Sequence, residues 1–229
     1  ICSIVQSNVG CNIGGVFYNL LAYADDIVLL APSWRALQLL INLLSNSALD
    51  INMSCNVAKT VCMVFKPRRA RMIVDYDFPC FTLNGVALQF VTEFKYLGHM
   101  IDNAFSDDND IKREIRNLFM RTNILIRRYS KCSVSVKLTL FKAYCMCLFD
   151  AGIWLHYTIT VFNKLKSCYN KCIKMFFGFK RQDSVTQMLV ELKLPSFDQL
   201  IADCRRSSNN SRVTCCNKLI CNLNSLQVL

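Results

Sequence analysis

The sequence predicts an α+β fold in which strands come first and helices follow. Short apolar runs bounded by turn residues fill the chain before residue 102, whereas apolar residues at helical spacing dominate after it. Lys and Arg also gather in the helical half, with few acids between them. These patterns divide the chain into a strand-rich part over 1–105, a helical part over 106–203 and a tail over 204–229 that is expected to be flexible.

The first predicted hairpin carries two adjacent carboxylates at its tip. Asp25 and Asp26 lie between the apolar runs 17–22 and 27–31, which are rich in Val, Ile, Leu and Phe and have the length of strands. An isolated Asp-Asp pair is often only a solvated turn. Here the two charges follow Tyr23 and stand between two apolar strands, and like charges so close together favour a divalent cation as their neutraliser.

A helix and two further strands are predicted after this hairpin. Apolar residues recur at helical spacing over 34–49, and Ser33 is a suitable N-cap. Lys59 and Thr60 then precede a strand over 61–65. Further on, the run 94–98, Phe-Lys-Tyr-Leu-Gly, ends a strand at a glycine that permits close approach of another backbone.

These three blocks, in this order, resemble the reverse transcriptases of LINE-type, non-LTR retrotransposons. The segment 20–33, LLAYADDIVLLAPS, is similar to the active-site hairpin of that family. The helix followed by Lys-Thr and a strand resembles the next block, and 94–98 with Ile101 resembles the block that grips the primer strand. The likeness extends over roughly 13–202, including Trp154 and the segment after it.

The resemblance implies a partial polymerase palm, with antiparallel strands, a YADD hairpin and a helix, followed by an all-helical thumb-like region. It implies an RNA-directed DNA polymerase that transfers nucleotides with two magnesium ions, or manganese in their place, on an RNA template and a DNA primer. Asp25 and Asp26 would be catalytic metal ligands. Lys59 would contact or protonate the leaving pyrophosphate, although a solvated lysine at a strand start is an equal interpretation.

In the same family comparison the residues Tyr96, Leu97 and Gly98 would form the primer grip, and the simpler alternative is an ordinary strand end.

The net charge of +11 favours a polyanionic partner. Two basic segments, 112–142 and 164–181, have helical periodicity, and the second is interleaved with aromatic residues that we assign to the core. Their cations either bind the backbone of a nucleic-acid duplex or merely solvate a helical bundle. The nucleic-acid interpretation is favoured by the scarcity of acids, and it selects Lys112, Arg113, Arg116, Arg121, Arg127, Arg128, Lys171 and Lys174.

Composition excludes some other classes of protein. The fourteen cysteines lack paired CxxC spacing and no secretory signal is visible, so reduced core cysteines of an intracellular protein, nuclear or cytoplasmic and not secreted, are expected. The apolar stretch 143–162 is long enough to span a membrane, but Asp150 interrupts it. We predict instead a buried helix ending near His156, in which Asp150 is a paired acid and not a metal ligand, and no membrane partner.

One expected part of a polymerase site is missing from the pattern. Two metal ions cannot be held by two neighbouring carboxylates alone, yet residues 1–24 contain no Asp or Glu. The chain is therefore expected to be the C-terminal portion of a polymerase, inactive by itself, with the upstream half of that polymerase as a partner. The alternatives are a non-catalytic module that binds RNA or DNA, and a relic of a retroelement.

Overall fold

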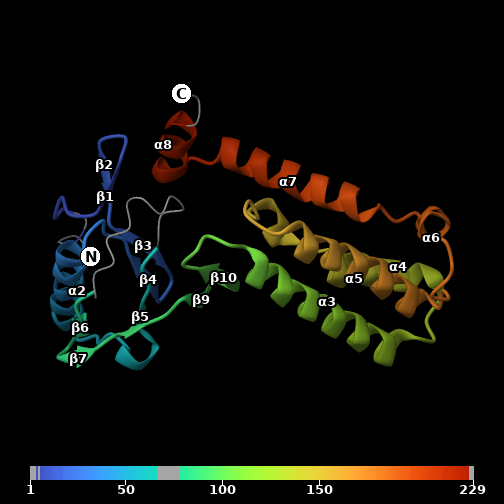
Figure 1. The fold of residues 1–229 in the computed structure, drawn as a ribbon, viewed down its shortest axis with the longest axis horizontal. Coiled ribbons are helices and arrows are strands. Elements are labelled where there is room, and N and C mark those ends of the chain that lie inside the picture. Colours follow the sequence, from blue (N-terminus) through green and yellow to red (C-terminus); the bar gives the residue numbers. More distant parts are fainter. Residues whose placement is uncertain (1–3, 5, 66–77, 227–229) are drawn as a thin grey trace. The chain divides into compact units, whose positions relative to one another are not determined.

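The computed structural model describes residue 4 and residues 6–65 and 78–226. The chain forms two compact units, one made of 1–92 with 215–229 and the other of 93–214 (Figure 1). Every described strand lies before residue 103, and most described helices lie after residue 107. The predicted mixed fold, with strands first and helices after them, is thereby confirmed.

The strands of the first unit form pairs and not one continuous sheet, within the described residues. β1 pairs with β2, β3 with β4 and β6 with β7, all antiparallel, whereas β5 and β8 are parallel. The strands are β1 (Cys11–Ile13), β2 (Val16–Tyr18), β3 (Leu20–Tyr23), β4 (Asp26–Leu29), β5 (Val61–Cys62), β6 (Thr82–Leu83), β7 (Val86–Ala87) and β8 (Gln89–Phe90).

Helix α2 (Trp34–Leu49) begins where the sequence predicts. The side chain of Ser33 accepts a hydrogen bond from the amide of Ala36, which satisfies one of the free donors at the helix start. The helix buries Leu40 and Ile41. Gln38 fixes its outer side, since its side chain both donates to and accepts from the backbone of Thr82 in β6. The core that results is small: Ile41, Cys62, Phe81, Leu83 and Leu88.

The first unit also includes helix α8 (Lys218–Leu226), from the far end of the chain. The hydroxyl of Tyr18 in β2 accepts a hydrogen bond from Asn222 at 2.7 Å and donates one to the carbonyl of Lys218 at 3.3 Å. A single tyrosine therefore ties segments some two hundred residues apart in the sequence.

The second unit is mainly helical, and α3, α4 and α5 lie side by side (Figure 1). α3 and α5 run parallel, because Thr158 contacts Asp108 at one end and Cys168 contacts the carbonyl of Ile115 farther along. The elements are β9 (Glu93–Tyr96), β10 (His99–Asp102), α3 (Asp108–Tyr129), α4 (Val134–Cys145), η3 (Phe149–Gly152), α5 (Ile159–Phe177), α6 (Val185–Leu192) and α7 (Phe197–Thr214).

A large aromatic core holds these helices together. Phe141, Trp154, Tyr169 and Phe197 are almost completely buried, each from a different segment of the unit. The buried hydroxyl of Tyr169 donates to the carbonyl of Pro195 at 3.0 Å, so its polar atom is satisfied inside the core. Burial also raises the pKa of this tyrosine.

Two segments differ from the predicted helices. The prediction of a buried helix that ends near His156 is wrong, because α4 ends at Cys145 and a loop with one 3-10 turn follows. The polar run 205–211, expected to be a flexible linker, lies inside α7, and the last three residues of the expected tail lie outside the described residues. None of the helices in the described part of the chain combines the length and the hydropathy that a membrane span needs.

Candidate functional site

The predicted hairpin with the carboxylate pair is present. Strands β3 and β4 pair in register from Leu20 opposite Leu29 to Tyr23 opposite Asp26, which leaves Ala24 and Asp25 as a two-residue turn. Ala24 has φ of +53°, in the left-handed region that such tight hairpin turns require. Because alanine has a Cβ atom, its backbone is strained in this region, where glycine would not be. Such backbone strain is often found at functional turns.

Both carboxylates at this turn are available to a ligand. Asp25 and Asp26 are exposed, and within the described part of the chain neither side-chain carboxylate makes a hydrogen bond or an ion pair. The ring of Tyr23, directly before them, is 65% exposed. Carboxylate oxygens that are free and adjacent fit a hard divalent cation such as magnesium. They supply only part of the six oxygens that the ion prefers.

A third protein ligand does not join them among the described residues. No group of three potential ligand atoms within 4.8 Å of one another includes Asp25 or Asp26, in the segments for which side chains are placed.

Lys59 ends a single 3-10 turn, η1 (Val57–Lys59), directly before its C-cap residue Thr60 and β5. The side chain of Asn56 caps this turn by accepting from the amide of Lys59 at 3.2 Å. The lysine side chain is exposed, and no ion pair links it to the carboxylates at the hairpin tip in the described structure. Its role therefore stays a prediction.

The second unit presents another tight hairpin, formed by β9 and β10. Tyr96 pairs with His99, so Leu97 and Gly98 form the turn. Both have positive φ, +47° for Leu97 and +88° for Gly98, as a type I′ turn demands. Glycine fits there without strain, but leucine does not, and the side chain of Leu97 is 52% exposed. The turn is thus an exposed backbone edge with a strained apolar residue.

Sequence reasoning missed the residue that holds this hairpin. Asp110, in the first turn of α3, is completely buried. Its carboxylate accepts hydrogen bonds from the amide of Met100 at 2.9 Å, from Nε of Arg113 at 2.7 Å and from Nε1 of Trp154 at 2.8 Å. Nδ1 of His99 lies 2.9 Å from Oδ2. The signal that could have found it is the acidic run 107–110 at a helix start, where negative charge suits the helix dipole.

The environment moves the pKa values of both members of this pair. Burial acts to raise the pKa of the Asp110 carboxyl, but the donors from His99, Arg113, Met100 and Trp154 outweigh it and lower the pKa well below its usual range. The hydrogen-bonding carboxylate of Asp110 raises the pKa of His99; burial opposes this, and Asp150 and Asp107 add to it. The pair is therefore arranged to be ionised.

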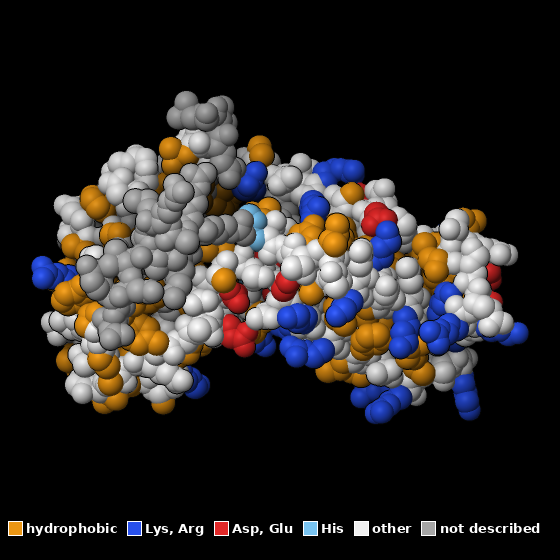
Figure 2. Space-filling model, viewed as in Figure 1, with side chains coloured by type: hydrophobic (Ala, Val, Ile, Leu, Met, Phe, Trp, Pro, Cys, Tyr) orange, Lys and Arg blue, Asp and Glu red, His pale blue; other side chains and the backbone are white. Residues whose placement is uncertain are grey.

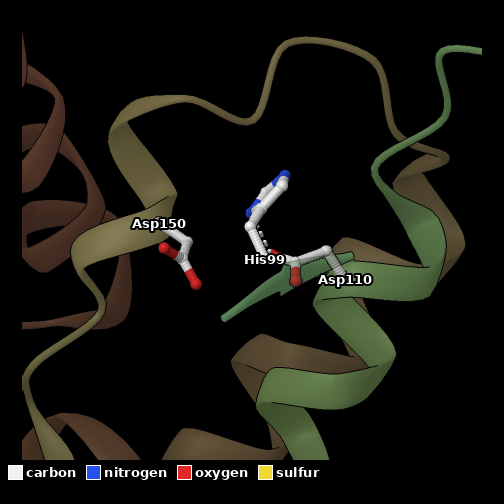
Figure 3. A group of neighbouring side chains, drawn as sticks. All are labelled: His99, Asp110 and Asp150. Carbon is white, nitrogen blue, oxygen red and sulfur yellow. Dashed lines mark ion pairs between the residues drawn. The ribbon is translucent and has the colours of Figure 1, made fainter. Parts of the chain in front are cut away.

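Figure 3 shows His99, Asp110 and Asp150 directed toward one another from β10, α3 and η3. Three such side chains could hold a metal ion. Arg113 already lies between the two acids, however, with Nε on Asp110 and another guanidinium nitrogen 2.5 Å from Asp150. The arrangement is thus a charge-paired cluster, and Asp150 is the paired acid that the sequence suggested.

The other acids at the start of α3 fix the loop before α5. Oδ2 of Asp107 accepts from the amides of Leu155 and His156 at 2.8 and 2.7 Å. Asp108 accepts from the amide and the hydroxyl of Thr158, at 2.7 and 2.9 Å. One short acidic segment therefore organises a hairpin, a loop and the start of a second helix.

The cations predicted to bind nucleic acid divide into two groups. The side chains of Arg113 and Arg121 are only 15% and 26% exposed and pair with acids of the bundle, Arg121 with Glu114. Lys174 donates to the carbonyls of Arg181 and Asp183, at 2.8 and 2.6 Å, which secures the end of α5. The exposed group consists of Lys112, Arg116, Arg127, Arg128 and Lys171.

The exposed cations lie on two neighbouring helices, α3 and α5. Nζ of Lys171 in α5 lies 5.4 Å from the centre of the Phe119 ring in α3, a cation–π contact that joins the two surfaces. On the face shown in Figure 2, Lys and Arg side chains gather over the helices of this unit, with few acids among them. Such a surface suits the phosphate backbone of a nucleic acid.

A comparison with known proteins supports the likeness suggested by the motifs. The chain is 25% identical over 198 residues to the protein named RNA-directed DNA polymerase from mobile element jockey, of Drosophila funebris. The match covers 79% of this chain and 20% of that protein, so the chain spans about a fifth of its relative. No family model and no solved structure matches the chain. The similarity over most of the chain confirms its resemblance to the reverse transcriptases of non-LTR retrotransposons.

Proposed function

We propose that the chain is the palm end and thumb of an RNA-directed DNA polymerase of a non-LTR retroelement. The observation that carries the proposal is the pair of free, exposed carboxylates at a tight hairpin turn. The sequence similarity to a mobile-element polymerase supports it. The class of reaction is transfer of a nucleotide to a DNA primer on an RNA template.

Asp25 and Asp26 would hold magnesium, or manganese in its place. When bound, the ions neutralise charge on the attacking and leaving oxygens of the phosphoryl group. The exposed ammonium of Lys59 would contact the leaving pyrophosphate. The Leu97-Gly98 turn would lie against the primer strand, and the exposed cations of α3 and α5 would contact the duplex backbone.

We further propose that the chain does not catalyse by itself. Two carboxylates provide too few ligands for two metal ions, and no third ligand atom joins them within the described segments. The remaining metal ligands would then come from outside the described segments. The protein would act inside the cell, in the nucleus or the cytoplasm.

The metal site can be tested apart from catalysis. Mn²⁺ titrated into the full chain and followed by electron paramagnetic resonance is expected to bind weakly, and binding should be lost in Asp25→Asn and in Asp26→Asn. Asp203→Asn, which removes an exposed carboxylate of the helical unit, is the matched control and should leave binding unchanged. Equal binding by all four proteins would refute the metal site.

Activity is tested by primer extension on an RNA template with magnesium. The chain alone should give no product. Template-dependent synthesis that disappears in Asp25→Asn would overturn the proposed inactivity while supporting the polymerase site.

The second candidate is a non-catalytic module that binds RNA or DNA, favoured by the exposed cations on α3 and α5. Under this alternative, binding to a hybrid duplex would fall steeply with salt and would be the same in Asp25→Asn and Asp26→Asn. A chain that binds neither metal nor nucleic acid at low salt would instead be a relic of a retroelement.

A further inference from the structure

We propose that Asp110 is a positioning residue, which holds the β9–β10 hairpin on α3 so that the Leu97-Gly98 turn and the cations of α3 form one nucleic-acid-binding surface. The inference rests on the proposed binding of nucleic acid by this unit. It assigns Asp110 a role through its neighbours, since a completely buried carboxylate does not touch a ligand.

The hairpin is held at the two residues that follow its turn. Asp110 accepts from the amide of Met100 and lies against the ring of His99, so both contacts are within two residues of Gly98. A second contact fixes the other strand, because Nδ2 of Asn109 donates to Glu93 in β9 at 2.8 Å. The first turn of α3 thus contacts both strands of the hairpin through side-chain hydrogen bonds.

The carboxylate is itself held from the helical side. Arg113 donates to Oδ1 and Trp154 donates to Oδ2, so neither oxygen is free to rotate away from the hairpin. The same first turns of α3 carry Lys112 and Arg116, both exposed. One side chain therefore fixes the position of the exposed turn relative to the nearest cations.

An aspartate suits this position because three donors hydrogen-bond its two oxygens and Nδ1 of His99 lies 2.9 Å from one of them. An asparagine of the same shape has one acceptor oxygen, and its amide group would face donors on the other side. Asp110→Asn should therefore loosen the hairpin while keeping the volume of the side chain.

The test measures binding of a fluorescently labelled RNA–DNA hybrid duplex to the full chain by anisotropy at low salt. Asp110→Asn is expected to bind about tenfold more weakly, the size of coupling found between residues of one hydrogen-bond network. Asp203→Asn removes the same charge at an exposed site and should bind as well as the unchanged chain, or better. Because loss of a negative charge favours a polyanion, weaker binding by Asp110→Asn has the opposite sign to the charge effect.

Hydrogen exchange gives the second measurement. The amide of Met100 should be protected in the unchanged chain and exchange faster in Asp110→Asn, while the far-UV circular dichroism of the helices is retained. If Asp110→Asn does not fold, His99→Gln is tested instead by duplex binding and by hydrogen exchange at Met100. This variant removes one of the two contacts between Asp110 and β10, so weaker binding and faster exchange are again expected.

The outcomes separate this inference from the proposed function. If the unchanged chain binds no duplex, the proposed function fails. If it binds, and the folded Asp110→Asn variant binds as tightly as Asp203→Asn, the positioning role is refuted. Binding lost together with protection at Met100 supports it.

Discussion

At the scale of single residues, the informative side chains are those whose charge is balanced by partners far away in the sequence. Asp110 is the main example, because its three hydrogen-bond donors and the nearby imidazole of His99 come from β10, α3 and the loop before α5. A carboxylate that is buried in this way stabilises the fold only while its partners remain. Arg113 and Arg121 are cationic examples. The local charge pattern predicted that they bind nucleic acid at the surface, but in the structure each pairs with an acid of the helical bundle.

The pair of His99 and Asp110 predicts how stability depends on pH. The folded-state pKa of His99 is raised, by Asp110 above all, so the ionised imidazole contributes stability that is fully present below its unfolded pKa of about 6.5. That contribution is lost as the pH rises through the higher folded pKa. Urea unfolding followed by helical circular dichroism should therefore show stability falling as the pH rises above about 6.5. His99→Gln should remove this slope and His156→Gln should keep it; a slope unchanged in His99→Gln would contradict the assignment.

The strained turn residue Leu97 gives a second residue-scale prediction. Its φ of +47° belongs to the left-handed region, which asparagine tolerates and leucine does not, and Asn-Gly is the preferred sequence of this turn. Leu97→Asn should raise the free energy of unfolding by about 0.5–1 kcal/mol. A matched change outside the turn, Leu155→Asn, replaces another exposed leucine and should give no such gain. Stability lowered by Leu97→Asn would show that leucine makes contacts that outweigh the strain.

At the scale of elements, local patterns were sufficient wherever an element depends on its own residues. The spacing of apolar residues and Ser33 predicted α2, and the turn between two apolar runs predicted the hairpin at Asp25. Predictions from local patterns failed where contacts with residues distant in the sequence determine the local structure. The chain leaves the helical path after Cys145, and in the loop that follows the ring of Trp154 donates to Asp110. For the candidate site, the sequence indicated the hairpin at Asp25 and a strand ending at Gly98, but not the second hairpin, whose anchoring residue Asp110 has a partner 44 positions away.

The polar run 205–211 lies in α7, which packs closely against η3. A Cβ atom added to Gly152 would lie 2.4 Å from Cβ of Ser208 in α7, so glycine allows the helix to approach η3. Gly152→Ala should lower the free energy of unfolding by about 1–3 kcal/mol, through overpacking. Adding Ser208→Gly should recover part of this loss in a urea-unfolding cycle. Ser207→Gly, on an exposed position of the same helix, reports the cost of a helical glycine alone, about 1 kcal/mol. Purely additive effects of Gly152→Ala and Ser208→Gly would argue against the contact.

At the scale of the whole molecule, the two units differ in how much apolar surface they bury. Among the described residues, the core cluster of the first unit has five buried side chains, and its strands occur only in pairs. Two-stranded sheets are marginal in water without further packing. The helical unit has a continuous core from Ile111 to Ile201 that includes four large, almost fully buried aromatic residues. Stability therefore belongs mainly to the segment 93–214.

This difference predicts the course of limited proteolysis. Cleavage by a protease of low specificity at low concentration should begin in the first unit, because local opening there exposes little apolar surface. The surviving fragment, identified by mass spectrometry, should approximate residues 93–214. Tyr18 offers a control: Tyr18→Phe removes both hydrogen bonds to the segment of α8, so cleavage around residues 215–229 should become faster without a change in the helical fragment. Early cuts within α3 or α5 would show that the helical unit is not the more stable one.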